Sequence, residues 1–321
     1  MTGRDRPRVA FYCVSNDRYF IGAVGMLNSL RLMGHTEPVY LLDCGLTPEQ
    51  REIVAPHVTL VSNSGDALPF LLKTIAPLEH PAEVAVLIDA DMIVTRPLTE
   101  LVELAARGNV VAFRNDYDKF VPQWGELLGL GRAIPRPYVC SALVFLGGSV
   151  GGEVLRLMHE SQIRLETDLK TPELNIYHGA FLTLDQDVLN AILCTSVDAE
   201  RIAALEYRLA PNPPFRGLRV VDEEALRCAY EDGTEPNALH YLGPRVPWLV
   251  PSYHGIYSRL LSRLLVGDDV AVRVPRSQIP LRMRRGLLAR AERARVDSRD
   301  RLGWFVRMMK KRGMFKTKSF A

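Results

Sequence analysis

The segment from Val84 to Asp91, which reads Val-Ala-Val-Leu-Ile-Asp-Ala-Asp, constrains the fold more than any other part of the chain. Five consecutive apolar residues are typical of a strand buried on both faces, as in parallel sheets covered by helices. The run ends in Asp89 and Asp91, at the edge where open α/β sheets bind ligands. Two carboxylates there suit a hard divalent cation, and such a cation suits the diphosphate of a nucleotide. An acidic strand end without a ligand is the alternative interpretation.

The rest of the chain alternates between strand-like and helix-like segments. Apolar runs predict strands at residues 9–14, 39–42, 58–61, 84–88, 110–113, 140–146 and 238–242. Helical spacing and helix-start signals predict helices at residues 20–33, 69–75, 98–106, 151–165 and 188–193, and a short helix that opens at Thr47. This order predicts an α/β fold with a mostly parallel, doubly wound central sheet flanked by helices. Residues 116–137 and 210–217 are expected to be loops.

Short polar segments separate these elements. Asn16 and Asp17 follow the first strand and suit a turn that caps the next helix, and Gly34 is placed to end that helix. Thr47 and Gln50 form the pattern of a capping box, with proline at the first helical position between them. The first turn has no G-x-G-x-x-G fingerprint, which argues against a dinucleotide dehydrogenase, and the chain has no P-loop.

Charge is distributed unevenly along the chain. The formal net charge is +3, but residues 273–321 hold 16 Lys or Arg and only 3 Asp or Glu. Residues 1–272 hold the other 24 basic and 34 acidic side chains and are acidic overall. The change in composition predicts a large α/β domain at residues 1–272 and a basic tail at residues 273–321. The tail is expected to have an anionic partner.

One predicted helix face in this tail is apolar. Leu302, Phe305, Val306 and Met309 follow helical spacing, and arginine and lysine residues surround them. A basic amphipathic segment suits an anionic membrane surface, where each basic residue contributes about 1 kcal/mol. Packing against the acidic body is the alternative. The segment matches no nucleic-acid recognition motif, so nucleic acid is not an expected partner.

Cysteine usage and hydropathy predict a cytoplasmic location. The five cysteines are an odd number, and no two have the spacing of a zinc site or a redox motif, so reduced thiols are expected. No run reaches the ~18 apolar residues of a membrane-spanning helix. The N-terminal residues lack the apolar core and cleavage site of a signal peptide. With the basic tail, this predicts a cytoplasmic protein bound peripherally to the inner face of the membrane.

Two more polar constellations accompany the aspartate pair. His240 ends an apolar strand and precedes Gly243 and Arg245, and together these three suit a diphosphate. Two aspartates and one histidine are also a reasonable ligand set for Mn²⁺. Asp185 and Gln186 precede a predicted helix, where they could complement the helix dipole or bind sugar hydroxyls near a developing positive charge.

In their order along the chain, these motifs resemble those of GT-A glycosyltransferases, specifically glycosyltransferase family 8, which includes glycogenin and bacterial lipopolysaccharide galactosyl- and glucosyltransferases. Asp89 and Asp91 match that family's Asp-x-Asp motif. Residues 185–190 match its Asp-Gln-Asp-x-x-Asn motif, and residues 240–248 match its His-x-x-Gly-x-x-Lys-Pro-Trp motif at all but one fixed position. Residues 16–30 resemble its first nucleotide-binding segment. The resemblance covers residues 8 to about 250.

The resemblance implies a retaining transfer of a hexose from a UDP-sugar, with Mn²⁺ or Mg²⁺ as cofactor. A cell-envelope or lipid-linked glycan is the expected acceptor. Asp89, Asp91 and His240 are implied metal ligands, and Asp185 and Gln186 are implied catalytic residues beside the sugar. The implied contacts to the nucleotide sugar are Asn16, Asp17, Lys73, Ala90, Gly243 and Arg245. Front-face transfer, with the departing phosphate as base, is the preferred mechanism, and a covalent intermediate on Asp185 is the alternative.

The sequence departs from the family's motifs at two places. Val246 replaces the lysine of the histidine motif, and the adjacent Arg245 is the candidate to take over its phosphate contact. Cys140, Ser141 and Ala142 stand where the family has Asn-x-Gly, which is expected to alter the acceptor side. These departures support one alternative, a noncatalytic glycan- or membrane-binding protein on a transferase scaffold. A sugar nucleotidyltransferase is another, but it would need a glycine-rich loop that the first turn lacks.

Overall fold

The computed structural model describes residues 6–63, 72–169, 177–242, 246–249, 255–296 and 298. It describes the side chains of these residues except 166–169, 177 and 178. Gly243, Arg245 and the predicted amphipathic segment of the tail therefore lie outside the described residues. Residues 69–71 of the helix predicted at residues 69–75 do so as well.

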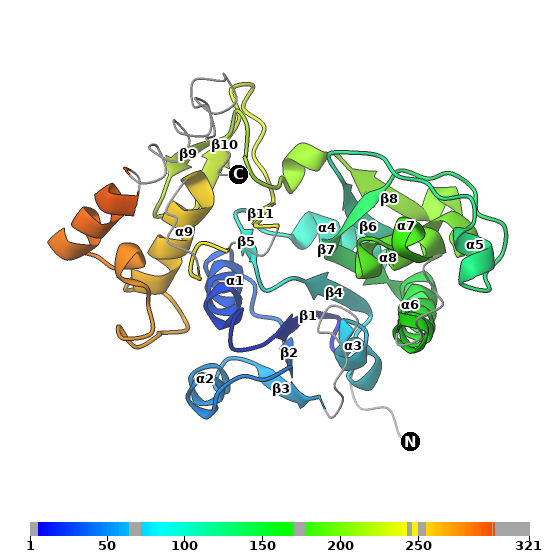
Figure 1. Ribbon diagram of the computed structural model, residues 1–321, viewed down its shortest axis with the longest axis horizontal. Coiled ribbons are helices and arrows are strands. Elements are labelled where there is room, and N and C mark those ends of the chain that lie inside the picture. Colours follow the sequence, from blue (N-terminus) through cyan, green and yellow to red (C-terminus); the bar gives the residue numbers. More distant parts are fainter. Residues whose placement is uncertain are drawn as a thin grey trace, which may run out of the picture.

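In the described ranges, seven strands form a central sheet in the order β3-β2-β1-β4-β7-β6-β8 (Figure 1). Their bounds are β1 (Val9–Ser15), β2 (Val39–Asp43), β3 (Thr59–Ser62), β4 (Val84–Ile88), β6 (Val110–Arg114), β7 (Val139–Gly147) and β8 (Ile202–Leu205). Strand β7 runs antiparallel to β4 and β6, and the other neighbouring strands are parallel. The predicted α/β fold with a mostly parallel sheet is confirmed.

Two short ladders lie beside this sheet. Strand β5 (Met92–Val94) pairs antiparallel with β11 (Ala238–His240), and Met92 lies opposite His240. Strand β9 (Arg219–Asp222) pairs antiparallel with β10 (Arg227–Ala229). Because β5 begins one residue after Asp91, its pairing with β11 brings the predicted histidine to the predicted aspartate pair.

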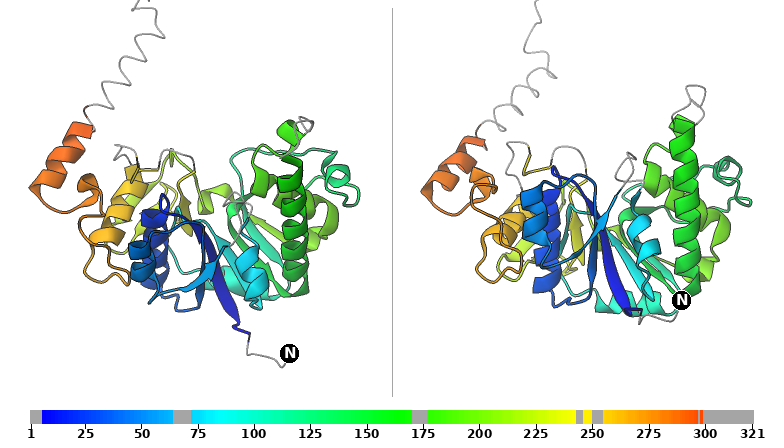
Figure 2. Two further views of the ribbon diagram at one scale, coloured as in Figure 1. Left: turned by 60° about the horizontal axis from the view of Figure 1, so that its bottom comes forward. Right: turned by 90° about the horizontal axis from the view of Figure 1, so that it is seen from below.

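Helices cover both faces of the sheet. They are α1 (Phe20–Leu32), α2 (Pro48–Val54), α3 (Ile75–Glu79), α4 (Thr99–Ala106), α5 (Trp124–Leu127), α6 (Gly148–Leu169), α7 (Tyr177–Ala180), α8 (Leu184–Ser196) and α9 (Gly255–Val266). Figure 2 shows the sheet between α1 on one side and α6 on the other. No helix in the described part of the chain is long and apolar enough to cross a bilayer.

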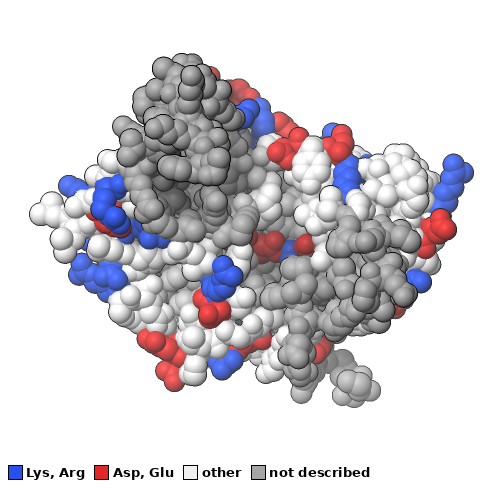
Figure 3. Space-filling model, in the orientation of Figure 1, with Lys and Arg blue, Asp and Glu red and all other residues white. Residues whose placement is uncertain are grey.

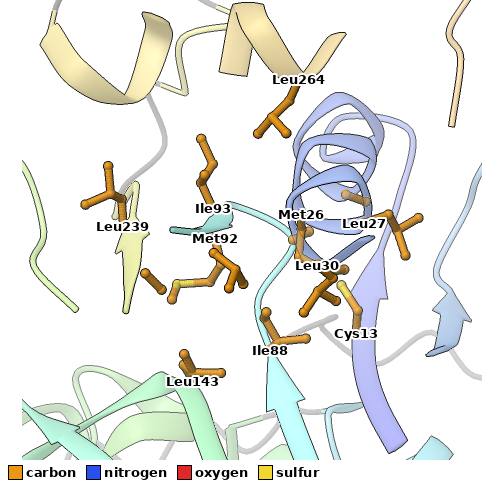
Figure 4. Close-up of a cluster of buried hydrophobic side chains, with 14 of the residues drawn as sticks. Cys13, Met26, Leu27, Leu30, Ile88, Met92, Ile93, Leu143, Leu239 and Leu264 are labelled. Carbon is orange, nitrogen blue, oxygen red and sulfur yellow. The ribbon is translucent and has the colours of Figure 1, made fainter. Parts of the chain in front are cut away.

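In the part of the chain that the structure describes, the core consists of two clusters, one on each face of the sheet. Alternate residues of β4 divide between them: Val84, Val86 and Ile88 join the cluster with α1 and α9, and Ala85 and Leu87 join the cluster with α6 and α8. This is the two-sided burial that the uninterrupted apolar run predicts. Figure 4 shows the first cluster where α1, β5 and β11 meet. The site is therefore built on strands that are fixed from both sides.

Local signals in the sequence have mixed outcomes. Gly34 follows α1 with a φ of 85°, in the left-handed region that favours glycine, and Thr47 forms the expected capping box with the third residue of α2. The prediction that the first turn caps α1 is wrong. The N-cap is Tyr19, which makes no side-chain cap hydrogen bond. The Asn16 Oδ1 accepts hydrogen bonds from the backbone N–H groups of Arg18 and Tyr19, and closes a turn just before the helix.

Several elements differ from the predictions in extent. In the described part of the predicted helix at residues 69–75, only Ile75 is α-helical, as the first residue of α3. The helix predicted at 188–193 begins earlier, at Leu184, because Asp185 and Asp187 occupy its favourable first turn. The expected loop at 116–137 contains the short helix α5. Strands β5 and β8 to β10 and helix α9 were not predicted.

Hydrophobic packing continues past the change in composition at residue 273. Val274, Ile279 and Met283 are buried in the cluster that contains α1 and α9. The Asn28 side chain in α1 accepts a hydrogen bond from the Val272 backbone N–H at 2.7 Å and donates one to its carbonyl at 2.9 Å. Residues up to Met283 are therefore attached to the body of the protein.

Candidate active site

A cavity of about 480 Å³ lies where β1 and β4 end. Figure 3 shows acidic and basic side chains at the bottom of a hollow near the middle of the face that it draws. Of the predicted site residues, the cavity is lined by Asn16, Lys73, Asp89, Ala90, Asp91, Asp185, Gln186 and His240. Asp17 is not in its lining: the side chain is exposed, and its carboxylate accepts a hydrogen bond from the Arg18 N–H at 2.8 Å. Gly243 and Arg245 are outside the described residues.

Asp89, Asp91 and His240 come together at one side of this cavity. One potential ligand atom from each lies within 4.8 Å of the others. The first aspartate is held by its backbone N–H, which donates to the Ala142 carbonyl at 2.8 Å, and by its carbonyl, which accepts from the Met92 N–H at 3.1 Å. The resulting turn follows the rigid strand β4. Two carboxylates and one imidazole fit Mn²⁺ as a donor set, so the residues present are compatible with the implied metal.

Neighbouring groups fix the orientation of His240 and Asp91. The His240 Nε2 lies 3.4 Å from the Asp91 carboxylate, and its Nδ1 lies 3.9 Å from the Cys140 sulfur. Burial lowers the pKa of His240, but the Asp91 carboxylate outweighs this effect and holds the pKa well above its usual range. The Asp91 carbonyl accepts hydrogen bonds from the Tyr257 hydroxyl at 2.9 Å and the Tyr241 N–H at 3.1 Å. Through Tyr257, helix α9 therefore holds the backbone of Asp91 in place.

Lys73 links the aspartate pair to the opposite wall of the cavity. Its ammonium lies 2.6 Å from Asp89 and 2.7 Å from Asp185, and the side chain is 10% exposed. Burial opposes the charged form of Lys73, but the two carboxylates outweigh burial and raise its pKa. Burial raises the pKa of Asp89 to about 6, and the Lys73 ammonium acts in the opposite direction. One cation therefore serves two carboxylates from distant parts of the chain.

Asp185 and Gln186 face the cavity from the first turn of α8. The Ser141 hydroxyl donates to the Asp185 Oδ2 at 2.7 Å, and the Ser141 N–H donates to the Gln186 Oε1 at 3.4 Å. Ser141 belongs to the segment that departs from the family's Asn-x-Gly. The sequence marked that departure, but it gave no signal that the serine hydroxyl would contact Asp185.

The remaining polar residues of the same motif are structural. Asp187 is fully buried and accepts hydrogen bonds from Lys119 at 2.8 Å and from the Tyr138 hydroxyl at 2.7 Å. Asn190 donates to the Val139 carbonyl and accepts from its N–H, both at 2.8 Å. Asp187 anchors the loop at 116–137, and Asn190 fixes the start of β7.

The histidine motif also holds the first crossover in place. Trp248 donates from its indole N–H to the Arg18 carbonyl at 2.7 Å. A Cβ at Gly22 would lie 2.6 Å from both the Ala90 carbonyl oxygen and the Trp248 ring, so α1 packs closely against the turn between the aspartates. Val246, which replaces the family's lysine, is fully buried in the core cluster of α1. The side chain at this position therefore contributes to packing.

Several cavity residues were not identified from the sequence. Tyr19, Thr183 and Leu242 line the cavity, each within three residues of a predicted site residue. Their neighbours carry recognisable chemistry, whereas a tyrosine before a helix or a leucine after a strand has no distinctive spacing. Their closeness in sequence to the predicted site residues is the signal that could have identified them.

The strand order, with antiparallel β7, and the Asp-x-Asp pair at the strand ends define the GT-A glycosyltransferase fold. Two solved structures to which the chain is similar are both of LgtC. An active-site mutant of LgtC aligns with a TM-score of 0.54 and 15% identity over 84% of this chain and 98% of that chain. The galactosyltransferase LgtC in complex with donor and acceptor sugar analogues aligns with a TM-score of 0.52 and 16% identity over the same fractions. No protein-family model matches the chain, and no curated protein does.

Proposed function

We propose that this protein is a metal-dependent retaining glycosyltransferase, which moves a hexose from a UDP-sugar to a cell-envelope or lipid-linked glycan. The observation that carries the proposal is the meeting of Asp89, Asp91 and His240 in one cavity with Asp185 and Gln186. The similarity in fold to a galactosyltransferase that binds donor and acceptor sugar analogues supports sugar transfer.

The two sides of the cavity would have different tasks. Asp89, Asp91 and His240 would hold Mn²⁺ or Mg²⁺, which when bound offsets the negative charge of the departing diphosphate. Residues proposed to contact the nucleotide are Asn16 and Asp17 at the first crossover, Ala90 between the two aspartates, and Gly243 and Arg245 after β11. Lys73 would place a second positive charge between the diphosphate side and the sugar side.

The contacts of Asp185 favour an electrostatic role over a nucleophilic one. Its Oδ2 already accepts hydrogen bonds from Lys73 and Ser141, and these donors stabilise the carboxylate charge and so lower its nucleophilicity. We therefore prefer front-face transfer, in which the acceptor hydroxyl attacks the face from which the diphosphate leaves. The hydroxyl proton passes to the departing phosphate oxygen, and the Asp185 carboxylate stabilises the positive charge on the sugar. A covalent intermediate on Asp185 is the alternative.

Calorimetry with a panel of nucleotide sugars, with and without Mn²⁺, tests the donor site. Asp91→Asn should abolish metal-dependent binding, while the exposed control Asp118→Asn should bind as the wild type does. Product analysis by NMR then gives the anomeric configuration, and inversion would contradict the retaining mechanism. If the folded protein binds no nucleotide sugar, the noncatalytic alternative replaces this proposal.

We also propose that the basic tail holds the protein on the inner face of the membrane. The composition of residues 273–321 and the apolar spacing of residues 302–309 support this role. Because Val274, Ile279 and Met283 pack in the core, a truncation should end at Asp300 rather than before the composition change. Full-length protein should float with anionic liposomes and the truncated protein should not. Equal flotation would contradict the proposal.

A further inference from the structure

Arg282 connects the C-terminal part of the chain to the segment that follows β11. It belongs to the short 3-10 helix Leu281–Met283, within the range 273–321 that the composition assigned to a separate basic tail. Its guanidinium donates twice to the Pro247 carbonyl, from Nε at 3.1 Å and from a terminal nitrogen at 2.5 Å. This basic residue of the expected tail therefore contacts the histidine motif of the large domain.

The contact between Arg282 and Pro247 is partly shielded from water. Pro247 is buried and Arg282 is half-buried. Burial lowers the pKa of Arg282, and the nearby Glu292 acts in the opposite direction. A carbonyl oxygen has two lone pairs, and the planar guanidinium presents its donors in a rigid fork, so two N–H groups can share one acceptor. Because hydrogen bonds from a charged donor are the stronger kind, this pair fixes the main chain at Pro247.

The segment that carries Arg282 is itself fixed to the body of the protein. Met283 is fully buried in the core cluster of α1 and α9, and its carbonyl accepts from the Ser262 hydroxyl of α9 at 2.7 Å. The Arg293 guanidinium donates to the Arg282 carbonyl at 2.9 Å and to the Arg284 carbonyl at 3.2 Å. Figure 1 shows α9 beside α1. The Arg282 side chain therefore extends from a rigid part of the structure.

From Pro247, contacts continue to the wall of the cavity. The next residue, Trp248, donates from its indole N–H to the Arg18 carbonyl at 2.7 Å. Its ring packs edge-to-face against the Tyr19 ring, with the centroids 6.1 Å apart. Tyr19 lines the cavity at the first crossover, where the nucleotide is proposed to bind. A displacement of Pro247 would therefore move the indole that holds this crossover.

We infer that Arg282 is a positioning residue for the nucleotide side of the cavity, because it fixes Pro247 and thereby the Trp248 indole that holds the first crossover. The inference rests on the proposed transferase function and adds to it a contribution from the C-terminal part of the chain. Arg282 is not among the described residues that line the cavity, so its effect passes through the turn at residues 246–249. Donor affinity then depends on a residue far outside the family's motifs.

Two substitutions with one control test this role. Arg282→Met keeps an unbranched apolar stem and removes the guanidinium. Arg282→Lys keeps the charge on a compact head without the planar fork, so it should retain part of the effect. Arg284→Met is the matched control, because Arg284 is also half-buried and donates to main-chain carbonyls outside the motif, those of Ile279 at 2.7 Å and Ser277 at 3.3 Å. The lysine variant keeps the test valid if Arg282→Met does not fold.

Fluorine NMR of the full-length protein labelled with 5-fluorotryptophan reports on the surroundings of Trp248. The chain has three tryptophans, so Trp248→Phe identifies the signal by its loss. Without any ligand, the Trp248 signal should shift in Arg282→Met, shift less in Arg282→Lys and stay in place in the control. A loss of stability alone would not shift this one signal in a protein that remains folded.

Calorimetry with UDP and Mn²⁺ on the same proteins measures the nucleotide side alone. Arg282→Met should weaken UDP binding about fivefold or more, Arg282→Lys should weaken it less, and the control should bind as the wild type does. An unshifted Trp248 signal, unchanged UDP binding or an equal loss in Arg284→Met would overturn only the inference. If the folded wild type binds neither UDP nor a nucleotide sugar, the proposed function is overturned, and the inference with it.

Discussion

Replacing Lys73 with methionine should destabilise the metal-free protein and strengthen its response to Mn²⁺. Methionine keeps most of the apolar stem but removes the charge, which leaves Asp89 and Asp185 without their shared cation. Removing one partner of a buried ion pair costs about 3–5 kcal/mol. The side chains of Asp89 and Asp185 are 27% and 14% exposed, so solvent screening puts the expected loss near the lower limit, about 3 kcal/mol.

Thermal unfolding followed by circular dichroism measures both effects. At about 2 °C per kcal/mol for a protein of this size, the midpoint in EDTA should fall by about 6 °C. Mn²⁺ bound by Asp89, Asp91 and His240 would restore a positive charge beside Asp89. In the variant, no lysine ammonium competes with the ion for the Asp89 carboxylate. The rise in midpoint on adding Mn²⁺ should therefore be larger for the variant than for the wild type.

Lys119→Met is the matched control. The Lys119 ammonium lies 2.8 Å from Asp187, which is fully buried and does not line the cavity. This variant should lose similar stability but gain no additional response to Mn²⁺. If both variants respond to Mn²⁺ as the wild type does, Lys73 is not electrostatically coupled to a metal site, and the reasoning is refuted.

Two further predictions concern proton release and backbone packing. Burial lowers the pKa of His240, but Asp91 outweighs it and raises the pKa, so Mn²⁺ binding must displace a proton and its affinity should rise with pH. Calorimetry in two buffers of different ionisation enthalpy measures this proton, and its absence would argue against a histidine ligand. Gly22→Ala should lower the free energy of unfolding by about 2 kcal/mol, because the new Cβ would lie 2.6 Å from the Ala90 oxygen. Gly152→Ala in α6 meets no atom within 4 Å and should raise it by about 0.5–1 kcal/mol, and equal changes in urea unfolding would contradict the packing argument.

Features that depend on neighbouring residues were predictable from the sequence. Strand β4 follows from an uninterrupted apolar run, and both of its faces are buried as expected. The capping box at Thr47 depends only on residues within one helical turn. The order of strands and helices likewise predicted a mostly parallel sheet, because each element carries its own periodicity.

Features that depend on distant pairing were not predictable from spacing. Strand β5 has three residues, which is too short for a periodic signal, and nothing in the sequence paired it with the predicted strand that became β11. Their pairing nevertheless decides that His240 lies beside Asp91. Strand β8 contains two alanines, which have low strand propensity, and it forms because β6 pairs with it. The sequence offered His240 as a ligand candidate from its place at a strand end, but only the tertiary pairing places it beside Asp91.

Asp185 and Asp187 show a further limit of sequence patterns. Both occupy the first turn of α8 and both could complement the helix dipole. In three dimensions, Asp185 contacts Lys73 in the cavity, and Asp187 contacts Lys119 beneath a loop. The partner lysines are far away in the chain, so the local sequence pattern does not separate the two roles.

The pairing of β5 with β11 has a consequence for the order in which the proposed transferase is assembled. During synthesis, Asp89 and Asp91 emerge long before His240, and a partly made chain holds an incomplete set of ligands. Completion requires a late, long-range contact, and the His240 N–H at the same strand end then donates to the Pro211 carbonyl. A metal that needs all three ligands would bind only the finished protein, and it would stabilise that state more as the free ion concentration rises above its dissociation constant. The availability of the ion in the cell would therefore govern the lifetime of the folded protein as well as its catalytic rate.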